Sequence, residues 1–430
     1  MNETMKRRWD LSRNWLEIDL DAAWHNVRSL RRSLPRNAEI MAVVKDNGYG
    51  HGAFPMAKAF LEGGATQLAV STMEEGKQLR MAGIEAPILI LSPVPVRHYR
   101  ELIFFDLMPT IIDVVQARSF AARASAQGVK MPFHLKVDVG MNRYGLKVDD
   151  PVSLDRAESI LRLKSLTCQG IFTHLPCADD PGADSITRNQ VASYTAFCHE
   201  LENRGVKINR RHVANSATAI RFPEFAFDLV RPGLALYGVL PNGCEDWQGR
   251  LKPVMRWQAE VIQVTDIPAE SGVSYNMTWQ AEQPTRIAVI GVGYGDGYSR
   301  TWSPGAKVHP STHKSLLNSI PEAEENERAE SDPDFLNADV VGRVCMDALV
   351  VSLPQERLAR YAYRPGAEVT LFGGDAGAMS AGDLAEIGHS IPYEVMTGIN
   401  SRVPRLYFSR KRPFLKSTGL YTYSHEPQNG

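Results

Sequence analysis

The sequence predicts an α/β protein in which an N-terminal (βα)₈ TIM-like barrel is followed by a mostly β C-terminal domain. Two observations lead to this fold. Between residues 41 and 238, short apolar runs rich in β-branched residues alternate with longer segments of helical periodicity. After about residue 252, strand-like runs follow one another across turns that contain Gly and Pro.

The predicted barrel strands are continuous apolar runs, which are typical of a parallel sheet covered by helices on both faces. The eight runs are MAVVK (41–45), QLAVS (67–71), PILIL (87–91), MPTII (108–112), FHLKVD (133–138), GIFTH (170–174), RHVAN (211–215) and DLVRPGLALYG (228–238). Segments between them, such as MEEGKQLRMAG and VVQARSFAARASAQG, have helical periodicity and end in glycine. Eight such units in roughly 200 residues fit a (βα)₈ barrel. An open doubly wound sheet is the alternative.

The second domain is predicted from its strand patterns. The runs are VMRWQAEVIQVTDI, TRIAVIGVGYGDG, ADVVGRVCMDALVVSL and EVTLFGG. One short helix is expected in SAGDLAEIGHSI, because Ser380 followed by Asp383 forms a capping box.

These patterns set the expected domain boundaries. We place the barrel at residues 15–252 and the β domain at residues 253–413. Residues 303–335 are polar, contain proline and become acidic toward their end, so we expect a flexible excursion there. Residues 414–430 are expected to form a loose tail.

Composition is that of an ordinary soluble globular protein, with 43% hydrophobic and 23% charged residues in 430. A net charge of −1 argues against binding nucleic acid or a membrane surface by bulk electrostatics. The five cysteines are too few and too scattered for a disulfide framework, and no CxxC pair suggests zinc. The N-terminus has no continuous apolar stretch typical of a signal peptide. We therefore expect a cytoplasmic enzyme without a metal.

Candidate site residues follow the predicted strands, where active sites of (βα)₈ barrels lie. They are Lys45 after strand one, Asp138 and Arg143 after strand five, His174 after strand six, Asn215 and Ser216 after strand seven, and Arg231 and Gly233 within strand eight. A lysine can bind an aldehyde as a Schiff base, while a hydroxyl and backbone amides at Ser216 and Gly233 can hold a phosphate. Together these groups predict a site for pyridoxal 5′-phosphate (PLP).

Arg231 indicates which PLP reaction the site favours. An arginine that faces the pyridine nitrogen does not give up its proton, so the ring stays a weaker electron sink. Proton removal and return at one carbon is then favoured over transamination.

Each of these residues also has an ordinary structural interpretation. Lys45 could be a surface lysine, and His174 a polar residue with satisfied hydrogen bonds. Arg231 could form a structural ion pair, and Ser216 could cap a helix. The placement of all four on successive strand ends favours a shared site.

The motifs around these residues resemble those of the alanine racemase family, from EIDLDAAWHNVRSLR (17–31) to PYEVMTGINSRVPR (392–405). The matching stretches are AVVKDNGYGHG, KVDVGMNRYG, THLPCAD, HVANSAT, VRPGLALYG, GVSYNMTW, GRVCMD and PYEV. The resemblance implies a PLP enzyme of fold type III that interconverts L-alanine and D-alanine and supplies D-alanine for peptidoglycan. It also implies a homodimer with active sites shared between subunits, acting on a small-molecule amino acid.

The same resemblance implies a role for each matched residue. The catalytic bases are Lys45 on one face of the substrate Cα and Tyr275, donated by the partner's β domain, on the other. The implied cofactor-binding residues are Lys45, Tyr49, His174, Ser216, Arg231, Gly233 and Tyr393. Arg143 and Met346 are implied to bind substrate, and Lys136 and Asp347 to support them; in the family, the lysine matching Lys136 can be carbamylated.

The chain departs from the family pattern at two positions near Lys45. Asp46 stands where the family commonly has a small residue, and Gly48 where it usually has alanine. If Asp46 faces the site, it alters the charge near Lys45. Serine or broad-specificity racemisation, a PLP decarboxylase of the same fold and a PLP-binding protein without catalysis are the alternatives. The tyrosine in SYNMTW favours a racemase over a decarboxylase, and the β domain argues against a carrier, which resembles a lone barrel.

Overall fold

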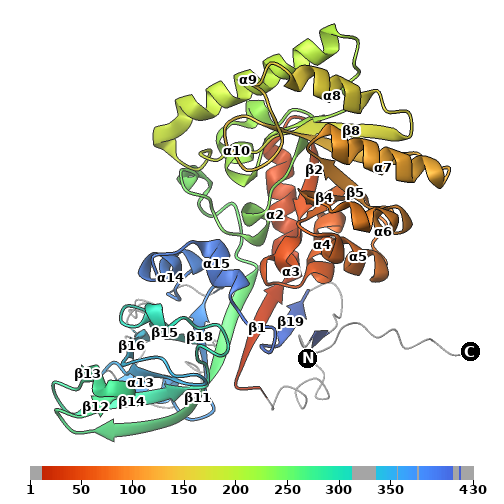
Figure 1. Cartoon of the computed structure of the whole chain (residues 1–430). Coiled ribbons are helices and arrows are strands. Elements are labelled where there is room, and N and C mark those ends of the chain that lie inside the picture. The colour runs from red at the N-terminus through yellow and green to blue at the C-terminus, as the bar shows by residue number, and fades with distance from the viewer. Residues whose placement is uncertain (1–11, 312–335, 356, 375–376, 410–415, 418–430) are drawn as a thin grey trace, which may run out of the picture. The chain divides into compact units, whose positions relative to one another are not determined.

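The structure is a computed structural model that describes residues 12–311, 336–355, 357–374, 377–409 and 416–417. The described residues form two compact units (Figure 1). Residues 21–252 make up one unit, and residues up to 20 together with those from 253 onward make up the other. Within the described residues, no helix is both long and apolar enough to span a membrane.

The first unit contains the predicted parallel barrel. Its strands are hydrogen-bonded in the order β10-β2-β3-β4-β5-β6-β8-β9. The strands are β2 (Glu39–Val43), β3 (Gln67–Val70), β4 (Ile88–Pro93), β5 (Met108–Ile111), β6 (Met131–Asp138), β8 (Leu166–Phe172), β9 (Arg211–His212) and β10 (Leu229–Val230). Next to β9 and β10, the Arg231 amide donates to the Ala214 carbonyl at 2.8 Å, so the two ends of the sheet meet. The barrel prediction is confirmed, and the open doubly wound alternative is wrong.

Helices surround the barrel strands, as Figure 1 shows. They are α2 (Leu20–Ser33), α3 (Lys45–Tyr49), α4 (Ala53–Gly63), α5 (Met73–Met81), α6 (Tyr99–Phe104), α7 (Val114–Ala126), α8 (Ser153–Leu161), α9 (Asp184–Asn203) and α10 (Ser216–Arg221). Short 3₁₀ helices follow at 96–98, 181–183, 223–225, 234–237 and 245–247, and β7 (Leu146–Lys147) pairs with β6 outside the ring. The last predicted strand is shorter than expected: β10 ends before Pro232, and Leu234–Tyr237 is a 3₁₀ helix.

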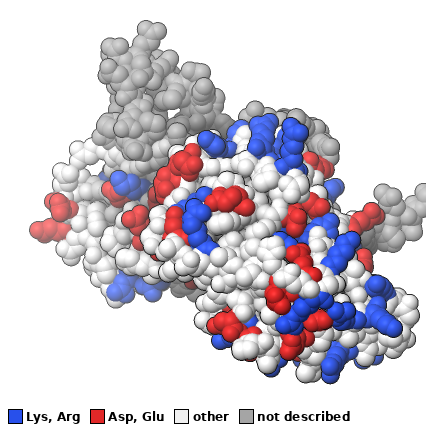
Figure 2. Space-filling view, turned by 90° about the horizontal axis from the view of Figure 1, so that it is seen from above, with Lys and Arg blue, Asp and Glu red and all other residues white. Residues whose placement is uncertain are grey.

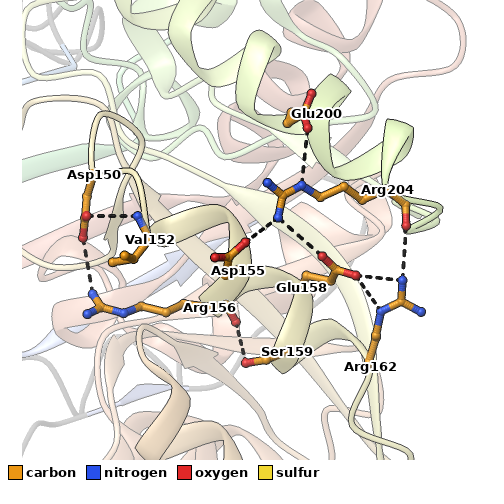
Figure 3. Close-up of polar contacts among 9 residues, drawn as sticks. All are labelled: Asp150, Val152, Asp155, Arg156, Glu158, Ser159, Arg162, Glu200 and Arg204. Atoms are coloured by element: carbon orange, nitrogen blue, oxygen red, sulfur yellow. Dashed lines mark hydrogen bonds and ion pairs between the residues drawn. The ribbon is translucent and has the colours of Figure 1, made fainter.

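A partly exposed ion-pair cluster joins α8 and α9 (Figure 3). Arg204 lies 2.6 Å from Asp155, 3.5 Å from Glu158 and 3.3 Å from Glu200. Arg162 pairs with Glu158 at 2.8 Å. Cations and carboxylates are likewise intermingled on the face shown in Figure 2, as expected for a net charge of −1.

The second unit is built on an antiparallel sheet that closes on itself. β11 pairs with both β18 and β14, so β11, β14, β17, β16, β15 and β18 form a closed ring of hydrogen-bonded strands. Its strands are β1 (Asn14–Asp19), β11 (Met255–Ile267), β12 (Gly272–Val273), β13 (Trp279–Gln280), β14 (Thr285–Ile290), β15 (Lys307–Pro310), β16 (Ala338–Val341), β17 (Leu349–Ser352), β18 (Glu368–Phe372), β19 (Arg405–Phe408) and β20 (Lys416–Ser417). The helices are α13 (Arg357–Ala362), α14 (Ala381–Ile387) and α15 (Pro392–Thr397), with 3₁₀ turns at 275–277 and 300–302. Ser380 and Asp383 form the predicted capping box of α14.

Three details differ from the expected boundaries. The N-terminal strand β1, which we expected to begin the barrel domain at residue 15, pairs with β11 and β19 of the second unit. The expected excursion at 303–335 contains strand β15 at residues 307–310, and residues 312–335 lie outside the described residues. In the expected tail, residues 416–417 pair with β19, and the rest lies outside the described residues. An apolar run shows that a strand forms, but not which free sheet edge it joins.

Candidate active site

Lys45 begins a left-handed turn directly after β2. The φ angles of Asp46, Asn47, Gly48 and Tyr49 are 53°, 52°, 61° and 50°. The turn is closed by 3.0 Å bonds from the Gly48 amide to the Val44 carbonyl and from the Gly50 amide to the Asp46 carbonyl. A left-handed conformation costs roughly 1–2 kcal/mol per residue that carries a side chain. Gly48 avoids this cost at its position.

The Lys45 amine lies at the edge of the barrel with Asp46 beside it. Its Nζ is 3.6 Å from Asp46 Oδ2, and the two side chains are 37% and 52% exposed. Asp46 therefore faces Lys45, and its carboxylate places a negative charge near the amine.

β6 brings Lys136 and Asp138 into the barrel, both buried. Lys136 Nζ donates to the Val137 carbonyl at 3.0 Å and lies 5.3 Å from the centre of the Phe172 ring. Burial, then the positive charge of Arg231, lowers the pKa of Lys136 to about 7. Asp138 Oδ1 accepts hydrogen bonds from the amides of residues 140 and 142, which shapes the loop that carries the exposed Arg143.

His174 is the point at which the cationic side chains converge. It follows β8 and is half-buried. Burial, followed by the positive charges of Arg231, Lys136, Arg143 and Lys45, lowers its pKa to about 3. The predicted residues of four different strand ends are therefore close enough to act on one imidazole, which stays neutral at pH 7.

Arg231 is buried and has no carboxylate partner among the described residues. Its Nη1 donates to His212 Nδ1 and to the His212 carbonyl, both at 2.9 Å. Its Nη2 donates to the carbonyls of Thr173 at 2.6 Å and Val213 at 3.2 Å. No described residue accepts a hydrogen bond from Nε, which leaves this donor for a ligand. Burial lowers the pKa of Arg231 to about 10, so it remains charged at pH 7.

A second imidazole extends this chain of hydrogen bonds. Because arginine only donates, His212 Nδ1 accepts and its Nε2 carries the proton. That Nε2 lies 2.8 Å from His134 Nδ1. Burial lowers the pKa of His134 to about 3 and that of His212 well below its ordinary value, so both stay neutral. The sequence analysis missed both histidines, although polar residues inside two buried strands were a signal.

Tyr49, Ser216 and Gly233 form a small polar cradle. Ser216 Oγ accepts hydrogen bonds from the amides of Gly233 at 3.0 Å and Ala235 at 3.2 Å. A Cβ on Gly233 would lie 2.3 Å from Tyr49 Oη, so only glycine lets the Tyr49 hydroxyl pack this close to the backbone. Ser216 is not the helix cap considered above: Asn215 caps α10, accepting from the Thr218 amide at 2.9 Å.

The other predicted residues lie in the second unit. Tyr275 is 67% exposed and Met346 is 54% exposed. The Met346 loop is held by the amides of Tyr294 and Gly295, which donate to the carbonyls of Cys345 at 3.0 Å and Met346 at 2.8 Å. Tyr393, on α15, is 37% exposed.

Arg402 holds Asp347 in place in that unit, a role that the sequence analysis missed. Its guanidinium pairs with Asp347 and with the buried Asp296, each at 2.8 Å. Asp296 Oδ2 in turn accepts from the Gly293 amide at 3.0 Å. Arg402 therefore joins the loop of Met346 to the glycine-rich loop that follows β14.

Comparison with known proteins identifies the family. The model of the alanine racemase N-terminal domain matches residues 18–241, and that of the C-terminal domain matches residues 254–317 and 333–407. The chain belongs to the alanine racemase family. A curated alanine racemase from Carboxydothermus hydrogenoformans is 36% identical to it over 396 residues, which cover 91% of this chain and 99% of that protein.

Solved alanine racemases have the same fold. The enzyme of Clostridium difficile 630 superposes with a TM-score of 0.83 at 28% identity, covering 95% of this chain and 99% of that one. The alanine racemase from Bartonella henselae, solved with covalently bound pyridoxal phosphate, superposes with a TM-score of 0.77 at 25% identity, covering 92% and 100%. The family uses PLP, as the strand-end residues predicted.

The residues present in this chain fit PLP. Lys45 supplies an amine for the aldehyde, and the hydroxyls of Tyr49 and Ser216 both lie against the backbone of Gly233, which carries no Cβ to separate them from it. Arg231 is a buried cation whose Nε has no protein acceptor among the described residues. A basic amine, a polar cradle and fixed positive charge are the groups that an anionic aldehyde requires.

Proposed function

We propose that this chain interconverts L-alanine and D-alanine by a two-base mechanism and supplies D-alanine for peptidoglycan. The observation that carries the proposal is a barrel with Lys45 after one strand and the buried Arg231, bonded only to uncharged acceptors, after another, in a chain that aligns over nearly its full length with alanine racemases. Bound PLP withdraws electrons from the substrate Cα and so makes its proton acidic. The protein then has to remove a proton from one face of Cα and return one to the other.

Lys45 and Tyr275 are the two bases in this proposal. Lys45 holds the cofactor and works on one face of Cα, and Tyr275 of the partner subunit works on the other. Inversion requires two opposed proton-transfer groups, since a single base returns the proton to the face from which it came. Arg143 and Met346 bind the substrate, with Lys136 and Asp347 supporting them.

Arg231 favours racemisation over other PLP reactions. A guanidinium whose pKa is about 10 keeps its proton at neutral pH, so the ring nitrogen that it faces stays unprotonated. Ser216, Gly233, Tyr49 and Tyr393 bind the phosphate.

A homodimer is supported by the surface of the second unit. Its exposed large apolar side chains are Ile262, Tyr275, Met277, Tyr294, Met346, Tyr361, Ile391 and Tyr393. Several of them come from the Tyr275 turn, the Met346 loop and α15, which are the segments assigned to catalysis and substrate binding. A partner subunit that covers these segments would bring Tyr275 to its site. We place this enzyme in the cytoplasm.

The proposal is tested by incubating the holoenzyme with L-alanine in deuterated water. D-alanine is measured by chiral chromatography and deuterium at Cα by NMR. Racemisation gives D-alanine with deuterium at Cα, and parallel reactions with L-serine and other amino acids define the substrate range. Release of carbon dioxide, or bound PLP without turnover of any amino acid, overturns the proposal in favour of a decarboxylase or a PLP carrier.

Two substitutions test the assignment of the bases. Lys45→Ala should abolish covalent PLP, while Lys130→Ala, at an exposed lysine, should not. Tyr275→Phe should retain covalent PLP and lose roughly 10²–10⁴-fold in racemisation rate. Tyr361→Phe is the matched control, since Tyr361 is another exposed tyrosine of the second unit. Full activity of Tyr275→Phe would show that the two-base assignment is wrong.

A further inference from the structure

The carboxylate of Glu75 accepts hydrogen bonds from three backbone amides. Its Oε2 accepts from Ser71 at 2.7 Å and Thr72 at 2.9 Å, and its Oε1 accepts from Asp46 at 2.6 Å. The Thr72 bond belongs to the capping box of α5, in which the Glu75 amide donates to Thr72 Oγ1 at 3.3 Å. The bond from the Asp46 amide connects α5 to the residue that follows Lys45.

The turn that carries Lys45 needs a hydrogen-bond acceptor from outside the turn. The amides at the start of a helical turn have no acceptor within the turn itself, whatever its hand. The Asp46 amide is such a donor, and it opens four successive residues with φ between 50° and 61°. Because the left-handed conformation is unfavourable for residues with side chains, contacts outside the turn have to stabilise it. The Glu75 carboxylate accepts from the Asp46 amide at 2.6 Å, and a charged acceptor makes a hydrogen bond roughly twice as strong as a neutral one does.

We propose that Glu75 is a positioning residue for Lys45: its carboxylate fixes the left-handed turn so that the amine is presented for covalent attachment of PLP. This inference rests on the proposed function, in which Lys45 holds the cofactor. No described Lys, Arg or His forms an ion pair with Glu75, so its charge is satisfied by the three amides. It joins the β3–α5 junction to the Lys45 turn, which ties the turns after two neighbouring barrel strands.

Three variants separate this role from a general effect on α5. Glu75→Gln keeps the size of the side chain but replaces one of the two acceptor oxygens with a donor, so it cannot serve all three amides. Glu74→Gln is the matched control, because Glu74 lies in the same helical turn, is exposed and loses the same charge. Thr72→Ala breaks the other half of the capping box and leaves the bond from Asp46 to Glu75 in place.

The experiment compares covalent and non-covalent capture of the cofactor by the apoprotein of each full-length variant. Covalent capture is followed by adding PLP, reducing the carbon–nitrogen double bond with borohydride at timed intervals and quantifying the Lys45 peptide by mass spectrometry. Non-covalent binding is measured with 4′-deoxypyridoxine 5′-phosphate, which has the ring and phosphate but no aldehyde.

We expect Glu75→Gln to reduce the rate of Lys45 labelling about tenfold or more, the effect of losing one hydrogen bond to a charged group. Its affinity for the deoxy analogue should stay within about twofold of wild type, because Ser216 and Gly233 lie outside the turn and Tyr49, at its far end, is held by its ring contact with Tyr237 at 4.8 Å. Glu74→Gln and Thr72→Ala should label as wild type does. This pattern identifies a positioning role, since loss of folding would weaken both measurements together.

Other outcomes overturn the inference. Labelling of Glu75→Gln at the wild-type rate, or a parallel loss of analogue affinity, would show that Glu75 does not act on Lys45. The same loss in Thr72→Ala would assign the effect to the cap of α5. If wild-type protein is not labelled at Lys45 at all, the proposed function itself fails and this inference fails with it.

Discussion

Substituting Gly233 with alanine tests the polar cradle most directly. The φ of Gly233, −116°, lies outside the left-handed region that requires glycine, and its ψ of −88° lies outside the range of a regular helix or strand. The new Cβ would lie 2.3 Å from Tyr49 Oη and 2.9 Å from Tyr49 Cζ. Tyr49 is only 5% exposed, and its ring centre packs 4.8 Å from that of Tyr237, so it has little room to withdraw. Adding a carbon to a packed site of this kind costs about 1–3 kcal/mol.

We expect most of this cost to appear as weaker cofactor binding, because Tyr49 and Gly233 line the space proposed for the phosphate. A loss of 1–3 kcal/mol raises the Kd roughly 5- to 150-fold. The assay is a titration of PLP into the apoprotein of wild type and Gly233→Ala. In a Tyr49→Phe background the closest contact is absent, so the same glycine substitution should cost less. An unchanged Kd, or equal costs in the two backgrounds, would refute the reasoning.

Three further predictions concern stability. Arg402→Ala should lower the free energy of unfolding by about 1–3 kcal/mol, because it leaves the carboxylate of the buried Asp296 without its cation. Urea unfolding should show a smaller loss for Arg402→Lys. Equal losses in the two variants would contradict the pairing of Arg402 with both Asp296 and Asp347. Burial lowers the pKa of Lys136 from 10.5 to about 7, so between these pH values the unfolded chain holds a proton that the folded chain has lost. Wild type should therefore gain stability over Lys136→Met by up to about 1.4 kcal/mol per pH unit as pH rises through this window, measured by urea unfolding in buffers free of carbon dioxide; parallel curves would argue against it. Arg204→Ala should lower the Tm at low ionic strength. The difference from wild type should vanish in about 1 M NaCl, since salt screens the partly exposed ion pairs of the α8–α9 cluster. A difference that survives salt would indicate lost packing instead.

The barrel could be predicted from the sequence because its signals are local. Most of its strands lie in short apolar runs between helical segments, and all eight predicted runs contain or overlap a strand. The place of β1 could not be predicted, because its pairing with β11 joins residues that are more than two hundred positions apart. A strand pattern shows which face is apolar, but the choice between free sheet edges depends on the assembled fold.

The residues of the candidate site also fall into two groups, those with a local sequence signal and those without one. Lys45, His174 and Arg231 could be found because barrel chemistry gathers at strand ends, whatever the sequence between them. Glu75 was visible only as a helix cap, since TMEE has the spacing of a capping box. The hydrogen bond that it accepts from the Asp46 amide depends on how two neighbouring turns approach each other. Arg402 was hidden for the same reason: nothing local connects it with Asp296 or Asp347.

Arg231 brings a buried positive charge into the barrel site. Its four recorded acceptors are backbone carbonyls and the imidazole of His212, all uncharged, so the guanidinium charge is held in place without being neutralised. A carboxylate in the position of His212 would have cancelled that charge. His212 donates a hydrogen bond from Nε2 to His134, and both imidazoles stay neutral. The two histidines therefore orient Arg231 without adding a charge of their own. The fixed positive charge that results is complementary to a phosphate and a carboxylate, and the family's cofactor and amino-acid substrate carry these two groups.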